Sequence, residues 1–257
     1  MTNIAPHLRI DSPFRERSVA PSAGAASPAP SPGQAPARGR APALMLRAMT
    51  GFEEEVAEER LGTPNTAQLC DELIARCLGP PGADFSDALA RVRALNIAQR
   101  DEALIALRRL SFGDRVDTRV TCPACGKGSD VDFNLSSLPI AVGHAPERIE
   151  VASPDNQAAV MRPPNAGDQE DLLDAGLALE SQRRSWLLAR VLLRYGDREG
   201  PFDLDFARAL PVSVRAALEA ALEDATPALD LSMAVVCNAC GHEFSAAFDV
   251  AAFFLPR

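Results

Sequence analysis

Two short stretches of the sequence decide the fold: Cys122-Pro123-Ala124-Cys125-Gly126 and Cys237-Asn238-Ala239-Cys240-Gly241. Each is a Cys-x-x-Cys pair followed directly by glycine, and together they offer four thiolates. Structural zinc sites are tetrahedral, and four cysteines are one of their usual ligand sets. The glycine suits a knuckle, in which the backbone turns tightly so that its amides point at sulfur. The pattern therefore predicts one structural Zn²⁺ with these ligands: Cys122, Cys125, Cys237 and Cys240.

The regions around the two pairs repeat each other. The shift that places Cys122 on Cys237 also aligns Phe133 with Phe248 and Leu135 with Val250. We expect each copy to be a strand, a knuckle and a second strand, a hairpin too small to bury a core alone. Two such hairpins that share one metal form a zinc ribbon, split here by the long segment between them.

Other uses of these cysteines stay open at this point. A Cys-x-x-Cys pair can be a redox pair or a disulfide, but thioredoxin-like pairs open a helix after a strand, and neither pair does so. The sequence shows no signal peptide, so an oxidising compartment is not indicated. His242 could replace one cysteine, although a surface position is favoured when four thiols are available. A catalytic metal is not expected, because four thiolates leave no position for water.

Composition favours a mainly helical, soluble chain. Of the 257 residues, 47% are hydrophobic, but there are only 11 Phe, one Trp and one Tyr, so the core is aliphatic and rich in alanine. No apolar run approaches the roughly 20 residues that span a bilayer. We expect one or two domains in an intracellular, cytoplasmic protein.

The charge is negative and uneven. The formal net charge is −9, whereas residues 1–47 carry six arginines against Asp11 and Glu16. Phosphate contacts by basic residues dominate nucleic-acid affinity, so an acidic body is a poor reader of DNA and a better candidate for binding protein.

The predicted fold class is α+β, a mainly helical body with a split zinc ribbon and an α/β insertion between its halves. The segments are a disordered basic Pro/Ala/Ser-rich tail (1–43), a helical region (44–114), the first hairpin (115–139), an inserted β-hairpin with helices (140–228) and the second hairpin (229–257). The tail is either dispensable or a docking peptide on a tether.

Periodicity and end signals predict the helices. They are Leu44 to Arg60, a helix with Thr66 as its candidate cap and with Cys70 and Cys77 buried as small hydrophobes, and a helix with a capping box of Asn96 and Gln99. The last buries Leu104, Ile105, Leu107 and Leu110, with Arg100, Arg108 and Arg109 mostly outside. In the insertion we expect helices over 168–179 and 181–195, the second burying Trp186, and a helix after Pro211.

Alternation predicts the strands, and they flank the cysteine pairs and open the insertion. Strands are expected at Val116 to Val120, at 148–151 and 158–161 around a turn, and at Leu229 to Val235. The apolar run 252–255 either caps the core or forms an exposed docking patch.

We find no catalytic motif. The phosphate-binding, dinucleotide, nucleophile-elbow and His-Glu-x-x-His patterns are absent from the sequence, which holds only three histidines. The acidic clusters Glu53-Glu54-Glu55 and 168–171 are explained by solvated helix faces and helix dipoles. We therefore do not expect an enzyme.

Several motifs occur in an order that is informative. They are Leu46-Arg47-Ala48-Met49-Thr50-Gly51-Phe52-Glu53-Glu54-Glu55, the run from Asp101 to Asp114 that includes Leu107-Arg108-Arg109-Leu110-Ser111-Phe112-Gly113-Asp114, the first Cys-Pro-x-Cys-Gly, Met161 to Asp168, and the final Cys-x-x-Cys-Gly-His-x-Phe. Over residues 44–257 the chain resembles the bacteriophage T4-like baseplate hub assembly proteins, in the zinc-knuckle form found beside contractile tail and injection-system genes. Met49 and Phe52 depart mildly from that pattern.

The resemblance implies a non-enzymatic assembly factor, or a minor component, of the baseplate hub of a phage tail-like contractile injection system. Its partners would be hub or other tail-assembly proteins, without a small-molecule substrate, nucleic acid or membrane. The alternative is a generic zinc-ribbon adaptor acting on nucleic acid or the transcription machinery.

Overall fold

The computed structural model describes residues 45–60, 63–79, 84–137, 146–226 and 232–247. The chain divides into two units, Met1–Ala43 and Leu44–Arg257, and the description concerns the second. The predicted tail (1–43) and the apolar run 252–255 lie outside the described residues.

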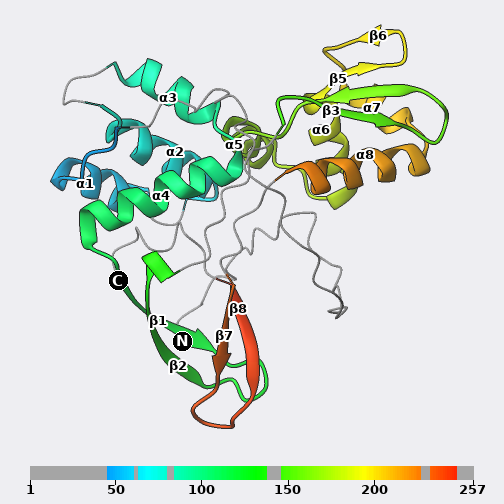
Figure 1. The fold of residues 1–257 in the computed structure, drawn as a ribbon. Coiled ribbons are helices and arrows are strands. Elements are labelled where there is room, and N and C mark those ends of the chain that lie inside the picture. The colour runs from blue at the N-terminus through cyan, green and yellow to red at the C-terminus, as the bar shows by residue number, and fades with distance from the viewer. Residues whose placement is uncertain (1–44, 61–62, 80–83, 138–145, 227–231, 248–257) are drawn as a thin grey trace, which may run out of the picture. The chain divides into compact units, whose positions relative to one another are not determined.

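The second unit has an α+β fold, as predicted. Within the described residues there are eight α-helices and three antiparallel sheets, two of which are isolated hairpins (Figure 1). The helices before the first hairpin and the strands of both hairpins share one hydrophobic core.

The helical body comprises α1 (Gly51–Glu59), α2 (Thr66–Arg76), α3 (Phe85–Arg93) and α4 (Ile97–Phe112). Capping residues in the sequence fix where these helices begin and end. Asn96 and Gln99 form the predicted capping box of α4, and Gly113 ends that helix with a φ of 85°. The α2 cap is Asn65, one residue before the predicted Thr66. The helix α3 was not predicted from the sequence.

The predicted helix over Leu44 to Arg60 is wrong in its first half, because α1 begins only at Gly51. Residues 45–47 are extended and pair with the end of α2: the Arg47 amide donates to the Cys77 carbonyl at 2.9 Å. The Arg47 side chain then binds Glu53 at 2.9 Å, and this hydrogen bond lowers the pKa of Glu53 to about 2. These long-range contacts outweigh the local helical pattern.

Two side chains of α4 are placed differently from the prediction. Arg100 is buried, because it lies between Asp71 of α2 and Asp101, and it donates to Asp101 at 2.9 Å. Leu110 is 53% exposed, since no described element covers that side of the last turn. Leu104, Ile105 and Leu107 are buried as predicted.

The two hairpins are copies of each other in register as well as in sequence. They consist of β1 (Arg115–Thr121) with β2 (Gly128–Asn134), and β7 (Ser232–Val236) with β8 (Glu243–Ala247). Thr121 pairs with Gly128 in the first, and the equivalent Val236 pairs with Glu243 in the second. A short 3-10 helix, Leu135–Ser137, follows β2.

Apolar residues of both hairpins enter the helical core. The buried ones are Val116, Phe133, Leu135, Val235 and Ala246. Neither two-stranded hairpin could bury this surface without the helices. The predicted strand from Leu229 to Val235 is found as β7, with residues 227–231 outside the described residues.

The insertion contains a four-stranded antiparallel sheet in the order β3 (Ile149–Ala152), β4 (Ala158–Met161), β5 (Leu192–Tyr195), β6 (Arg198–Glu199). Four helices accompany it: α5 (Ala166–Asp174), α6 (Glu180–Val191), α7 (Leu204–Ala209) and α8 (Val212–Ala225). Pro211 is the N-cap of α8, and Val214, Leu218 and Leu222 are buried from that helix. Figure 1 shows α6, α7 and α8 on one face of the sheet.

The predicted helices of the insertion are too long. The helix predicted over 181–195 ends at Val191, because Leu192–Tyr195 pairs with β4 and Gly196 turns the chain towards β6 with a φ of 58°. The helix predicted over 168–179 is α5, which ends at Asp174. Trp186 is only partly buried and lies under Arg190.

Ion pairs and hydrogen bonds, in which Glu170 is the buried charged partner, join α5 of the insertion to the helical body. Arg93 of α3 pairs with Glu170 at 2.5 Å and with Asp171 at 2.7 Å, and Asn65 donates to Asp174 at 2.7 Å. Asp71 beside them is fully buried, and neither of its oxygens accepts a hydrogen bond from the described residues. Burial raises the pKa of Asp71 to about 7, although Arg100 opposes the shift.

Asp71 should therefore make stability fall as pH rises. In the unfolded chain its pKa is about 3.9, so the native state binds an extra proton between that pH and pH 7. Asp71→Asn should raise the free energy of unfolding, and the gain should be larger at pH 8 than at pH 5 by roughly 1 kcal/mol or more. Urea unfolding at the two pH values measures it.

Asp224→Asn, at an exposed position of α8, is the matched control and should shift both curves equally. A net loss of stability for Asp71→Asn at pH 8 would show instead that attraction between Arg100 and an ionised Asp71 dominates.

Candidate metal centre

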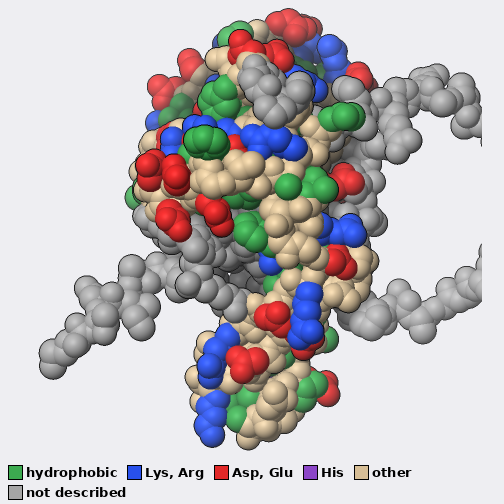
Figure 2. Space-filling model, turned by 90° about the vertical axis from the view of Figure 1, so that its left-hand side faces the viewer, with side chains coloured by type: hydrophobic (Ala, Val, Ile, Leu, Met, Phe, Trp, Pro, Cys, Tyr) green, Lys and Arg blue, Asp and Glu red, His purple; other side chains and the backbone are tan. Residues whose placement is uncertain are grey.

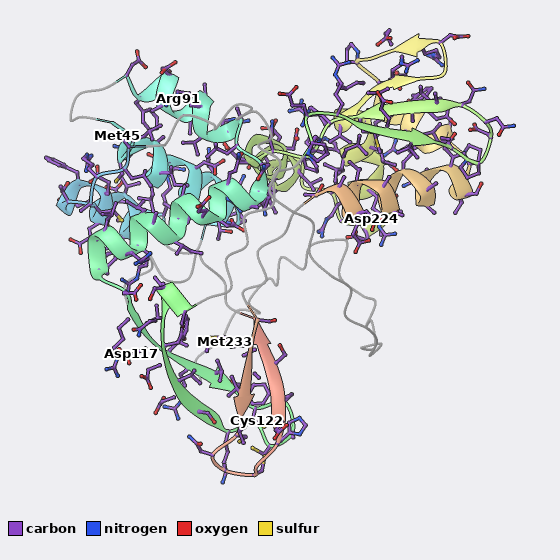
Figure 3. The ribbon with its side chains drawn as sticks, viewed as in Figure 1. Met45, Arg91, Asp117, Cys122, Asp224 and Met233 are labelled. Atoms are coloured by element: carbon purple, nitrogen blue, oxygen red, sulfur yellow. The ribbon has the colours of Figure 1, made fainter. Side chains whose placement is uncertain are left out.

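The four cysteines of the two pairs converge between the hairpins. Their Sγ atoms all lie within 4.8 Å of one another, and in Figure 3 Cys122 lies at the knuckle end of the strands. The Sγ of Cys122 is 3.8 Å from that of Cys240, and the Sγ of Cys125 is 3.7 Å from that of Cys237. A tetrahedron with metal–sulfur bonds of about 2.3 Å has edges of about 3.8 Å. The sulfur positions thus fit a tetrahedral ion.

These distances do not fit a disulfide, in which the sulfurs are about 2.05 Å apart. The close pairs also join one hairpin to the other, whereas a redox Cys-x-x-Cys would pair the two cysteines of one motif. None of the six cysteines of the chain, all of which the structure describes, forms a disulfide.

The two knuckles have the same backbone. The Gly126 amide donates to the Cys122 carbonyl at 2.9 Å, and the Gly241 amide donates to the Cys237 carbonyl at 2.9 Å. Their φ angles are 70° and 72°, a left-handed conformation that other residues adopt at a cost. The turn therefore requires the glycine after each second cysteine, as predicted from the sequence.

Backbone amides stabilise negative charge on sulfur in the second knuckle. Hydrogen bonds from the amides of Ala239 and Cys240 lower the pKa of the Cys237 thiol to about 6. The amide of His242 likewise favours the thiolate of Cys240, but hydrogen bonds with the sulfurs of Cys125, Cys237 and Cys122 outweigh it and raise the pKa of Cys240 to about 12. Four close sulfurs can all be thiolates only when a cation lies among them.

Ser129 is a residue of the site that sequence reasoning missed. It is buried on β2, and its Oγ donates to the Sγ of Cys237 across the two hairpins at 3.9 Å. Such contacts to ligand atoms orient them. The internal repeat gives no signal for it, because the equivalent position of the second hairpin is Phe244.

The remaining cysteines and His242 lie outside the cluster. Cys70 and Cys77 are buried in the helical core, and burial raises the pKa of Cys77 to about 11, which keeps it a thiol. The exposed ring of His242 stacks on Phe244 with its centroid at 6.2 Å.

The hairpin surface carries charges of both signs. Arg115 pairs with Asp117 and Asp132, and Arg119 pairs with Asp130, all on exposed positions of β1 and β2. The lower part of Figure 2 shows these signs interspersed. A continuous basic face, which nucleic-acid binding requires, is not seen on the side in view.

Comparison with known proteins identifies the family. A model of the family described as T4 bacteriophage base plate protein matches residues 42–255, nearly the whole chain. The chain belongs to the T4 bacteriophage base plate protein family. This confirms the resemblance to T4-like baseplate proteins that the sequence motifs indicated, and the matched region of this baseplate protein contains both cysteine pairs and the insertion between them.

No curated protein and no solved structure gives a significant match to this baseplate protein. Within the described residues, every helix is too short or too polar to cross a bilayer.

The knuckle glycines offer a test of local geometry. Gly241→Val should lower the free energy of unfolding by about 1–2 kcal/mol, because a β-branched residue is strained at positive φ. Gly241→Asn should cost less, since asparagine tolerates this conformation. Added side-chain atoms meet open space, because nothing lies within 4 Å of a Cβ built at this position.

Chemical denaturation of the two variants separates strain from crowding. Equal losses for Val and Asn would contradict the left-handed turn.

Proposed function

We propose that this chain is a non-enzymatic assembly factor or minor component of the baseplate hub of a phage tail-like contractile injection system. Its protein-binding fold would be held by one structural Zn²⁺ bound to Cys122, Cys125, Cys237 and Cys240. The observation that carries the proposal is the family match over a chain whose four cysteines meet at tetrahedral spacing.

Zinc is the ion that this donor set favours. Soft thiolate ligands in a tetrahedral S₄ arrangement select zinc or iron–sulfur chemistry, whereas calcium and magnesium require oxygen ligands. Because four protein ligands leave no position for water, the ion would stabilise the fold without catalysing a reaction. A structural zinc contributes on the order of 10 kcal/mol to folding.

The division of the chain expected from the sequence, with an insertion between the two hairpins, supports the role of a protein-binding component. A metal at the knuckles would fix both ends of the insertion, since the hairpins flank residues 140–228 on either side. The insertion could then present its sheet and helices to hub or other tail proteins. We infer a cytoplasmic site of action during assembly, with or without retention in the particle.

Metal analysis tests the zinc. We expect one Zn²⁺ per chain by mass spectrometry under native conditions and a marked fall in melting temperature on chelation. Cys125→Ser and Cys240→Ser should lower the bound zinc sharply, because each removes one of four ligands. Cys70→Ala removes a thiol that lies outside the cluster and should leave the stoichiometry at one.

A wild-type protein that loses its metal without any change in melting would contradict the structural role. An unchanged zinc content in Cys240→Ser would contradict the ligand set.

Co-expression with the baseplate proteins of the same particle tests the function. We expect the wild-type chain to copurify with at least one of them and particles to lack a baseplate when the chain is deleted. Cys122→Ser should behave like the deletion if the metal-held fold is required, and Cys70→Ala should not.

Mass spectrometry of finished particles distinguishes a component, which remains, from an assembly factor, which is absent. Normal baseplates in the deletion strain would overturn the proposal.

A further inference from the structure

The insertion contains a cleft that the metal centre does not use. It measures about 810 Å³, within the range of ligand-binding clefts, and four arginines line it: Arg148, Arg162, Arg190 and Arg194. The chain as a whole carries a net charge of −9, so a concentration of arginines at one cleft is notable.

Register places part of the cleft on the sheet face opposite the core. Glu150 pairs with Val160, Val160 with Arg194 and Arg194 with Glu199, so these residues form one row across β3, β4, β5 and β6. In this row Val160 is buried, Arg194 is partly buried, and Glu150 and Glu199 are exposed, whereas the neighbouring row of Ile149, Met161 and Leu192 is buried throughout. Because successive side chains of a strand point to opposite faces, the first row lies on the outer face.

Two of the arginines are held in place by acidic residues of α5. Arg162 binds Asp168 through two hydrogen bonds of 2.6 and 2.8 Å, and Arg190 binds Asp171 at 2.6 Å. These pairs satisfy the guanidinium groups and fix the wall of the cleft. They leave little free charge at this wall.

The other two arginines are available. Arg148, at the start of β3, is exposed, and Arg194, on the central strand β5, is partly buried. Neither forms an ion pair with any residue that the structure describes, although Glu199 lies opposite Arg194 in the register. A guanidinium offers five donors in a planar fork that matches a carboxylate.

The rest of the lining is apolar at the centre and acidic at the edges. Leu193, Pro201 and Phe202 provide the accessible apolar surface, whereas Val160 lines the cleft but is buried. Glu150 and Glu199 lie on β3 and β6, the two edge strands of the sheet. Acidic side chains at both edges disfavour a polyanion such as nucleic acid, whereas a single carboxylate can reach Arg194 between them.

We propose that this cleft binds a segment of a partner protein in which an Asp or Glu is flanked by apolar residues. The carboxylate would pair with Arg194 and Arg148, and the apolar neighbours would cover Leu193, Pro201 and Phe202. The proposal rests on the proposed function as a protein-binding baseplate component and assigns the face of the chain that makes the contact.

Binding of short overlapping peptides that tile the baseplate proteins of the same particle tests the assignment. On an array probed with the full zinc-loaded chain, the bound peptides should share a carboxylate flanked by apolar residues. In fluorescence anisotropy, replacing that carboxylate by its amide should weaken binding by about tenfold or more, and so should Arg194→Glu and Arg148→Glu. Arg91→Glu, an exposed arginine of α3 (labelled in Figure 3), is the matched control and should have no effect.

The outcomes separate this assignment from the proposed function. If the double variant Arg194→Glu/Arg148→Glu copurifies with baseplate proteins as well as the wild-type chain does, the cleft is not the docking site and the baseplate role stands. If the wild-type chain captures no baseplate protein, the proposed function itself fails. If single-stranded DNA displaces the bound peptide from the wild-type chain and fails to bind the Arg194→Glu variant, that result would overturn the proposal in favour of a nucleic-acid site.

Discussion

The meeting of four sulfur atoms between two hairpins is the constraint on which the rest of the structure depends. Neither hairpin can bury a core alone, and more of the chain lies between them than within both together. Sulfur distances of 3.7 and 3.8 Å across the pair show that each knuckle completes the other. A bound ion would turn this proximity into a fixed link and offset the chain entropy of closing so long a loop.

At the ends away from the sulfurs, burial of apolar side chains anchors the same hairpins to the helices. Val116, Phe133 and Val235 enter the core that α2 and α4 build. The site is therefore held at two levels, by thiols at the knuckle end and by hydrophobic contact at the helical end. This arrangement suits a protein that must keep its shape while it binds others, and it agrees with membership of a baseplate family whose model spans both levels.

The ion pairs of this molecule differ in how deeply they are buried, and their contributions to stability differ accordingly. Glu170 and Arg100 are buried near the junction of the helical body with α5, where loss of Arg93 or Asp101 would leave a buried charge without its closest partner. On the hairpins, by contrast, the pairs are exposed and individually weak. The cleft of the insertion lies between these cases, since α5 neutralises Arg162 and Arg190, while Arg148 and Arg194 form no ion pair within the described part of the chain.

The sequence by itself determined the features that depend on neighbouring residues or on a repeated motif. The cysteine pairs with their glycines and the Asn96 capping box are local patterns, and the repeat that relates the two distant hairpins is written in the sequence itself; the structure agrees with these features and with the α+β class. Only the tertiary structure decided that residues 45–47 are extended, that Arg100 is buried, that Leu192–Tyr195 is a strand and that Ser129 reaches Cys237. Each of these depends on a partner far away in the chain, whose hydrogen bonds or charge outweigh the local preference, and one sequence carries no signal for such a partner.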